Sequence, residues 1–248
     1  MDNQLPDDEF SNVRFFDAVY NNNLLNIDNQ LFDAVRNNDL LNVQQLVLNG
    51  SDVNSRDRHS KTPLHYAKSI EIAQVLVLNG ADVNSRDGIG NTPLCYADSV
   101  EIVQFLVLNG ADINLRDCIG STLLFYAKTK EILQFLVLNG VDVNCRNSFG
   151  DTALHFAGFG DSLDASLSLI GDVDRYNNFE AIPVYRLSNC VKYAKFLLKN
   201  GADMHIKNNN GESTYDRVIQ SNNNELIELF EQYNAISKGL NIKEPCSE

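Results

Sequence analysis

The sequence contains no tryptophan, few cysteines and a shortage of basic residues. Its 248 residues include 20 Lys and Arg against 33 Asp and Glu, which gives a formal net charge of −13 at pH 7. Nucleic acids and anionic membrane surfaces attract proteins through Lys and Arg, so this balance argues against both as partners. The excess acid lies mainly before residue 61 and after residue 150, which leaves the middle of the chain nearly neutral.

The cysteines and the hydropathy exclude further classes of protein. The five cysteines are odd in number and form no C-x-x-C pair, which argues against a disulfide framework or a zinc site and favours a reducing compartment. The sequence contains no run of about 18 apolar residues, which is the length that could span a membrane. Residues 1–10 have neither the basic nor the apolar region of a Sec-type signal peptide. We therefore expect no membrane insertion and a cytoplasmic location.

Motifs of catalysis are also missing from the sequence. It has no G-x-S-x-G, no Gly-rich phosphate loop before a helix and no H-E-x-x-H. Nothing pairs a cysteine with a base, as nucleophilic catalysis requires. We expect no enzyme activity, no cofactor and no metal site.

What the sequence does contain is a repeat with a period of 30 residues. Val-Leu-Asn-Gly occurs at 47–50, 77–80, 107–110 and 137–140. Thr-Pro-Leu-His-Tyr-Ala at 62–67 recurs in altered form at 92–97, 122–127 and 152–157. Several motifs in the same phase predict a stack of similar units rather than one compact domain.

Each unit is predicted to hold two helices and an extended hairpin loop. Thr62 is a good N-cap, and Pro63 suits the first helical position, where its missing N–H costs nothing. Ser69 can cap a second, mostly apolar helix, which we expect to be buried on several sides. Gly80 can take the left-handed conformation that ends this helix, and residues 87–90 have a turn composition.

At these residues the sequence resembles the ankyrin repeat, over roughly residues 31–235. The resemblance rests on Thr-Pro-Leu-His-Tyr-Ala at 62–67 and Asn-Gly-Ala-Asp-Val-Asn at 79–84. It implies an all-α solenoid of helix-turn-helix units joined by extended hairpin loops. It also implies structural roles for the motif residues, with both motif histidines in hydrogen bonds that tie neighbouring loops together. These residues are Thr62, Pro63, Leu64, His65, Gly80, Thr92, Pro93, Gly110, Thr122, Gly140, Thr152, His155 and Gly201.

The repeat divides the chain into successive units with a cap at each end. An N-terminal segment, 1–30, has room for an extra capping helix, and a mobile tail is expected at 236–248. The units between them are 31–60, 61–90, 91–120, 121–150, a degenerate repeat at 151–180, a repeat at 181–211 and a C-terminal capping repeat at 212–235.

Three departures from the ankyrin pattern carry expectations of their own. The internal units have 30 residues rather than 33, and the missing residues fall between the two helices, so we expect a trimmed inter-helix edge over 61–180. The second helix of 151–180 would be 164–169, where serines replace apolar residues, which makes this unit the weakest. Residues 16–26 nearly duplicate 32–42, and could form either an extra capping helix or a competing first helix.

Two columns of residues along the loops are candidates for partner binding. An arginine column, Arg56 to Arg146, recurs every 30 residues, and an apolar residue follows three positions later at each loop tip from Ile89 onward. The arginines could instead form an ion-pair ladder with the following Asp residues, and the apolar residues could pack tip to tip. The candidate residues are Arg86, Ile89, Arg116, Ile119, Arg146, Phe149 and Phe179.

The function that the resemblance implies is a non-catalytic scaffold that binds an unknown protein partner through the hairpin tips and the concave helix face. We expect a monomer. The short repeats and Asn-rich composition look similar to ankyrin proteins of intracellular bacteria. This resemblance implies a second possible location, secretion into a host cell without a Sec signal, and a role as an effector acting on host proteins. An acidic inhibitor or mimic that covers a basic enzyme or a nucleic-acid-binding surface is the alternative, and a structural or self-associating module is a third class.

Overall fold

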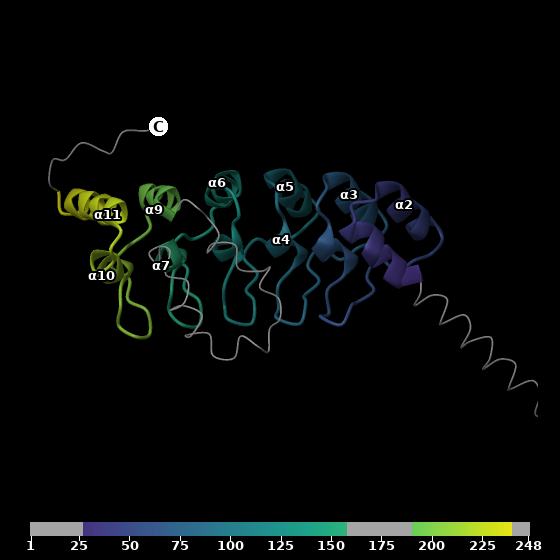
Figure 1. Ribbon diagram of the computed structural model, residues 1–248, viewed down its shortest axis with the longest axis horizontal. Helices are drawn as coiled ribbons and strands as arrows, with labels where there is room; N and C mark the ends of the chain where they lie inside the picture. Colours follow the sequence, from purple (N-terminus) through teal and green to yellow (C-terminus); the bar gives the residue numbers. More distant parts are fainter. Residues whose placement is uncertain (1–26, 158–189, 240–248) are drawn as a thin grey trace, which may run out of the picture.

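The computed structural model describes residues 27–157 and 190–239. Within these ranges the chain is helical, and strand-like pairing is limited to two isolated antiparallel bridges, Arg146 with Thr152 and Lys207 with Ser213. Helix pairs stack side by side along one direction, and hairpin loops lie along the edge opposite the longer helices (Figure 1). The predicted all-α solenoid is confirmed.

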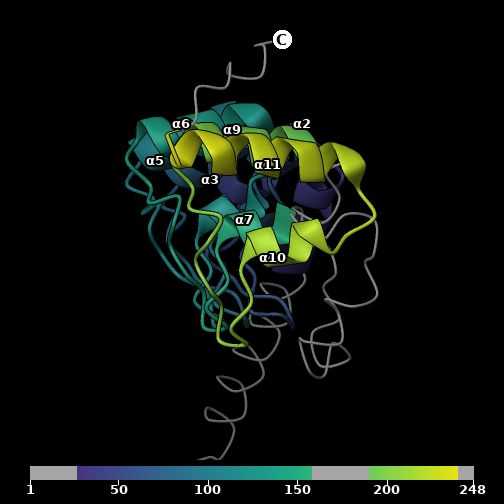
Figure 2. The same cartoon turned by 90° about the vertical axis from the view of Figure 1, so that its left-hand side faces the viewer.

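Each helix pair consists of a short first helix and a longer second helix. Residues 27–36 are helical and lead into α2 (Leu40–Leu48). Seen from the end of the stack, the second helices form one layer, the short helices form another beneath it, and the loops extend beyond (Figure 2). The pairs that follow α2 are η1 (Pro63–Tyr66) with α3 (Ile70–Leu78), α4 (Pro93–Tyr96) with α5 (Val100–Leu108), η2 (Leu123–Tyr126) with α6 (Lys130–Leu138), α7 (Ala153–Ala157) with α9 (Cys190–Lys199), and α10 (Thr214–Ile219) with α11 (Asn224–Ser237).

The second helices begin and end at the residues that the sequence indicates. The hydroxyl of Ser69 accepts from the backbone N–H of Ile72, and Thr129 caps α6 in the same way. At the other end, Asn79 donates from its side chain to the carbonyl of Val75 at 2.7 Å. Gly80 follows at φ +89°, a conformation that costs glycine little.

The first helices are shortened in the internal units, as the 30-residue period predicts. η1, α4 and η2 each have four residues, whereas α10 has six. Only residues 67–69, 97–99 and 127–129 connect these short helices to the second helices. The missing residues therefore come out of the first helix and its turn, and the trimmed edge is confirmed for the units between 61 and 138.

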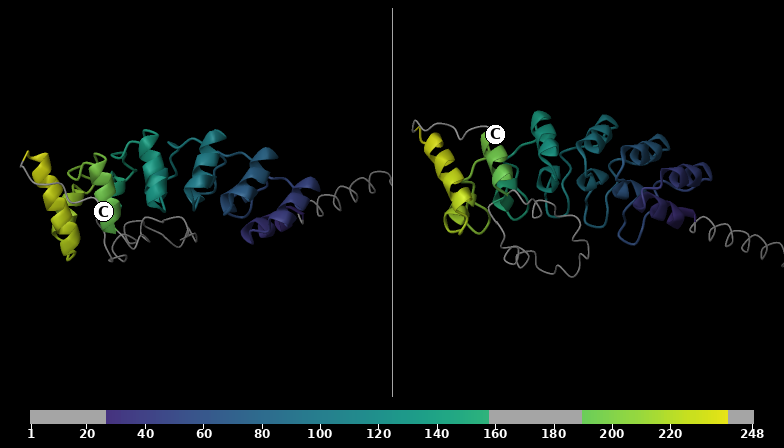
Figure 3. Two further views of the ribbon diagram at one scale, coloured as in Figure 1. Left: turned by 90° about the horizontal axis from the view of Figure 1, so that it is seen from above. Right: turned by 45° about the horizontal axis from the view of Figure 1, so that its top comes forward.

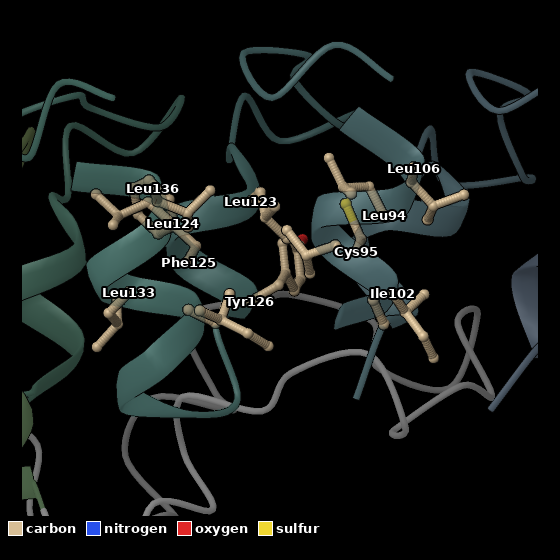
Figure 4. Close-up of a cluster of buried hydrophobic side chains, with 14 of the residues drawn as sticks. Leu94, Cys95, Ile102, Leu106, Leu123, Leu124, Phe125, Tyr126, Leu133 and Leu136 are labelled. Carbon is tan, nitrogen blue, oxygen red and sulfur yellow. The ribbon is translucent and has the colours of Figure 1, made fainter. Parts of the chain in front are cut away.

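A continuous apolar core joins the units. Leu94 and Leu106 of one unit and Leu124 and Leu136 of the next are all at most 1% exposed, and they lie in one buried cluster (Figure 4). An aromatic residue also recurs every 30 positions at the end of each short helix, and it is buried at Tyr126 and half-buried at Tyr66 and Tyr96. Because neighbouring units share this core, each one is stabilised mainly by the next.

The stack after α6 differs from the division predicted at 151–211. The side chain of Asn144 donates to the carbonyl of Gly201 at 3.0 Å and accepts from the N–H of Asp203 at 2.8 Å. Asn84 makes the same two bonds to Gly110 and Asp112, one unit further along. The loop after α9 is therefore the direct neighbour of the loop after α6.

This neighbour relation makes α7 and α9 one helix pair. The two helices pack against each other, so the described residues do not show separate units at 151–180 and 181–211. The serine-containing helix expected at 164–169 lies outside the described residues, as do the duplicated copy at 16–26 and most of the expected tail. Seen from above, α9 takes its place in the single row of second helices between α6 and α11 (Figure 3).

Candidate interaction surface

The hairpin loops are built around a column of carboxylates. One oxygen of Asp87 accepts from the backbone N–H groups of Ile89 (3.0 Å) and Asn91 (2.9 Å), which closes the turn. The other oxygen accepts from the hydroxyl of Tyr96 at 2.6 Å, which joins the hairpin to the short helix. Asp57 and Asp117 make the same contacts with Tyr66 and Tyr126. Burial first, and the bond to Asp87 second, raise the pKa of Tyr96, so the phenol stays protonated and donates.

The arginine column ties neighbouring hairpins together. Nη1 of Arg86 donates to the carbonyl of Arg116 at 2.7 Å, and Nη1 of Arg116 donates to the carbonyl of Arg146 at 2.8 Å. At the end of this run Nη2 of Arg146 donates to the carbonyl of Lys207 at 3.0 Å. The ion-pair ladder weighed from the sequence is wrong for these residues, because the arginines bind backbone carbonyls while the aspartates bind N–H groups and tyrosines. The arginine side chains are nonetheless exposed.

The tip row, defined here as Ile89, Ile119 and Phe149, lies on a backbone ladder. The carbonyl of Ile89 accepts from the N–H of Cys118 at 3.0 Å, and that of Ile119 accepts from Ser148 at 2.8 Å. Ile89 and Ile119 are half-buried, and Phe149 is 41% exposed. The backbone therefore holds these tips at a fixed spacing, with part of each apolar side chain facing solvent.

Phe179, the fourth member predicted for this row, lies outside the described residues. The place after Phe149 is taken by Asn210, because the 208–211 turn stacks directly on the 147–150 turn. The N–H of Asn209 donates to the carbonyl of Phe149 at 2.9 Å. Asn208 accepts from the N–H groups of Asn210 and Glu212, as Asn147 does from Phe149 and Asp151. The described tip row is thus apolar over three units and becomes polar at the fourth.

The motif histidines join neighbouring loops, in the way the resemblance implies. Nδ1 of His65 accepts from the N–H of Thr62 at 3.0 Å, and Nε2 lies 3.2 Å from the carbonyl of Asn91. Since a backbone N–H can only donate and a carbonyl can only accept, the ring is neutral with its proton on Nε2. His155 repeats the arrangement with Thr152 and Glu212.

These histidines are therefore structural, and their environment opposes protonation. Burial lowers the pKa of His65 to about 4, although the bond to Asn91 acts in the other direction. Thr62 is the N-cap residue of η1, as expected, and forms a capping box with His65. Its hydroxyl also lies 2.9 Å from Nδ1 of His65. Within 27–157 and 190–239, no group of three or more His, Cys, Asp or Glu side chains could hold a metal ion.

An asparagine ladder runs along the other side of the loops and has one gap. Asn54 and Asn84 each donate to the carbonyl of the next unit's glycine, at 2.8 and 2.9 Å. In the described part of the chain Asn114 makes no such bond to Gly140, although it keeps its own turn with Asp112. The difference lies next to it, where Leu115 stands at the position of the smaller, buried Ser85.

The second helices carry an apolar feature that the sequence analysis missed. Leu48, Leu78, Leu108 and Leu138 are 82–85% exposed, although these helices were expected to be buried on several sides. Helix geometry separates the two directions, because Leu78 lies two residues after the buried Leu76 and so points about 200° away from it, but it does not say which of the two is buried.

The comparisons with known proteins agree with this architecture. A family model described as "Ankyrin repeats (3 copies)" matches residues 31–117, 95–179 and 123–241. The chain is similar to a solved ankyrin repeat protein, EF0377, with 27% identity and a TM-score of 0.62, over 83% of this chain and 98% of that one. No protein with a curated description matches the chain.

These matches carry a general expectation of function. Ankyrin repeats generally mediate protein–protein interactions, and the family consists generally of non-enzymatic scaffolds. None of the described helices is long and apolar enough to cross a bilayer. The family model covers most of the chain, and the described residues form a stack of helix pairs. The chain belongs to the ankyrin repeat family.

Proposed function

We propose that the chain is a non-catalytic module that binds a protein partner through its hairpin tips and the adjoining concave face of the short helices. The observation that carries the proposal is the tip row, where partly exposed apolar side chains recur on consecutive hairpins. Exposed apolar groups that line up over several units are a common mark of a binding site. The chain acts by display, as a stiff stack whose stability does not depend on the ligand.

The loops are rigid enough to present such a row without reorganising. Each tip is fixed from inside by a carboxylate or amide and from the side by the backbone ladder. The arginine column adds a bond from Arg86 to the next loop. A surface that is ordered before binding loses little conformational freedom when the partner arrives.

The chemistry of the row indicates the kind of partner. Ile89 and Ile119 offer apolar contacts, and the exposed guanidinium groups of Arg86 and Arg116 stand beside them. Acidic side chains in the partner would suit these cations, and aliphatic or aromatic ones would suit the tips. The proposed partner is a protein with an apolar ridge flanked by carboxylates, bound by one copy of this chain.

The test replaces the tips while leaving the ladders in place. Full-length protein with Ile89→Ser, Ile119→Ser and Phe149→Ser is compared with wild type in an affinity pull-down read by quantitative mass spectrometry. Proteins that contact the tips should fall at least tenfold with the triple variant. The matched control is Leu78→Ser, Leu108→Ser and Leu138→Ser, which removes as many apolar side chains from the opposite edge and should retain those proteins. Equal recovery with the tip variant would overturn the proposal.

Salt separates this function from the acidic-mimic alternative. The net charge of −13 and the exposed Asp82, Asp112 and Asp142 would support binding to a basic surface. Such binding should weaken steeply between low and physiological salt, whereas an apolar tip interface should change little. The affinity of a captured partner, measured across that range, decides between them.

The second part of the proposal is a role inside a host cell, as an effector acting on host proteins. It rests on the likeness to ankyrin proteins of intracellular bacteria in repeat length and Asn usage. A translocation reporter fused to the full chain tests it. Reporter signal in the host cytosol would support an effector role, and signal confined to the producing cell would refute it.

A further inference from the structure

The outer face of the second helices carries two uncharged rows. In α2, α3, α5 and α6 a glutamine is followed four residues later by a leucine, so that both point from the same side of the helix. All of these side chains are exposed, and the leucines are among the most exposed large apolar residues described. We call this surface the leucine stripe; it consists of Gln44, Leu48, Gln74, Leu78, Gln104, Leu108, Gln134 and Leu138.

The stripe has a definite end. In α9 the positions of the glutamine and the leucine are held by Lys195 and Lys199, as counted from the Asn-Gly that ends each helix. Lys199 is exposed, as Leu138 is in α6. The apolar surface therefore spans four adjacent helices, whose side-by-side arrangement is seen from above in Figure 3.

Acidic residues flank the stripe at both ends of the helices. Glu71, Glu101 and Glu131 are exposed in the first turns of α3, α5 and α6, seven residues before the leucines. Exposed Asp82, Asp112 and Asp142 follow just beyond the carboxyl ends of the same helices. Among the described residues, α3 and α5 contain no basic side chain, while Lys68 precedes α3 and Lys130 begins α6. The six flanking carboxylates outnumber these two exposed lysines, so the charge beside the stripe is mainly negative.

We propose that the leucine stripe binds a cationic amphipathic α-helix of a partner protein. Neighbouring packed helices lie about 8–10 Å apart, which sets the spacing of the leucines along the stripe. Seven residues of an α-helix rise about 10.5 Å, so apolar residues at i, i+7 and i+14 of the bound helix meet successive leucines. Its Lys or Arg side chains on the two flanks then face the glutamate row and the aspartate row.

A second copy of this chain fits the stripe poorly. One two-fold arrangement superimposes the leucine rows with the helices parallel, and it brings the glutamate row against its own copy. The other arrangement, with the helices antiparallel, brings the glutamate row toward the aspartate row. Both oppose like charges, and each copy carries −13 overall. An anionic bilayer is disfavoured by the same charges.

The experiment uses full-length protein and a synthetic probe. The probe is a fluorescent 21-residue peptide built from three heptads. It has leucine at the first and fifth positions of each heptad and lysine at the positions that stay exposed when the leucine face is bound. Its matched control has glutamate in place of every lysine. Fluorescence anisotropy should show saturable binding of the lysine peptide and at least tenfold weaker binding of the glutamate peptide.

Two sets of variants locate the binding. Leu78→Gln, Leu108→Gln and Leu138→Gln together should weaken the lysine peptide at least tenfold, with an unchanged circular dichroism spectrum because these side chains are exposed. Glu71→Gln, Glu101→Gln and Glu131→Gln together should weaken it severalfold and flatten its salt dependence. The tip-row triple variant should bind the peptide like wild type. This inference is independent of the tip proposal, so either can fail alone.

Three results would overturn the inference. The first is equal binding of the peptide by wild type and by the leucine variant. The second is a wild-type dimer in analytical ultracentrifugation that becomes a monomer with the leucine variant, which would assign the stripe to a second copy. The third is a cross-link in the free monomer between the stripe and residues 1–26, which would make the chain's own N-terminal segment the occupant.

Discussion

At the residue scale, the protein uses a few polar side chains to fix loops, and His65 and Asp87 use every polar atom of their side chains. The neutral His65 ring accepts at one nitrogen and donates at the other, and it is 3% exposed. Asp87 likewise uses one oxygen for the turn and one for Tyr96. Residues satisfied in this way are poor candidates for catalysis, because protonation or release would break the loop that they hold.

A first prediction concerns pH and His65. Its pKa is lowered from 6.5 to about 4 in the folded state, so the unfolded chain takes up more protons between these values. The contribution of neutral His65 to the free energy of unfolding is present above pH 6.5. It is lost as the pH falls toward 4, by about 3 kcal/mol in all. His65→Gln removes this titration. In urea unfolding, the wild-type protein should therefore lose more free energy of unfolding than the variant between pH 7 and pH 4.5. Parallel losses would show that His65 does not contribute.

At the element scale, one substitution explains the gap in the asparagine ladder. Ser85 and Cys145 are buried, and their side chains lie 3.3 and 3.5 Å from the hydroxyls of Thr62 and Thr122. Leu115 is too large for that place and is only half-buried. Its turn is also looser, with 3.4 Å between its N and the carbonyl of Asp112 against 3.2 Å at Ser85. We infer that the bulk of Leu115 moves the Asn114 hairpin out of reach of the next unit.

A second prediction follows from this account. Leu115→Ser should let Asn114 accept from the N–H of Asp142, as Asn84 does from Asp112. One such bond contributes roughly 1 kcal/mol, so protection of the Asp142 amide from hydrogen exchange should rise several- to tenfold. The reciprocal control, Ser85→Leu, should lower protection of the Asp112 amide by a similar factor. Unchanged hydrogen exchange in both variants would show that the side chain at position 115 does not cause the gap in the asparagine ladder.

At the scale of the whole molecule, the α7–α9 pair is the unusual unit. Its two helices pack together although residues 158–189 separate them in sequence, while three residues suffice at 67–69. Closing a longer connection costs more conformational entropy. The pair is attached to the preceding unit by Asn144 and by the bond from Arg146 to Lys207. We therefore expect the junction between α6 and α9 to be the place where the stack separates into two folding blocks.

A third prediction tests that junction. Asn144→Ala removes the bonds to Gly201 and Asp203 and should cost about 1–3 kcal/mol. Residues 190–239 should then lose hydrogen-exchange protection at a lower urea concentration than residues 61–140. Asn84→Ala removes the equivalent bonds between the loops after α3 and α5, in the middle of the regular stack, and should lower protection on both sides together. If residues 61–140 and residues 190–239 lost protection at the same urea concentration in both variants, the division into blocks would be contradicted.

The sequence by itself determined the repeat, the helix ends at Ser69 and Gly80 and the shortened first helices. These features depend on contacts within one unit or with the next, so a 30-residue period contains them. The tertiary structure decided three further points: the pairing of α7 with α9, the use of the arginines as loop ties, and the exposure of Leu78 and its equivalents. Asn144 and Gly201 are 57 residues apart, and no local pattern indicates which loop will lie beside another. Exposure likewise depends on which side of a helix the neighbouring units cover, and only the assembled stack fixes that.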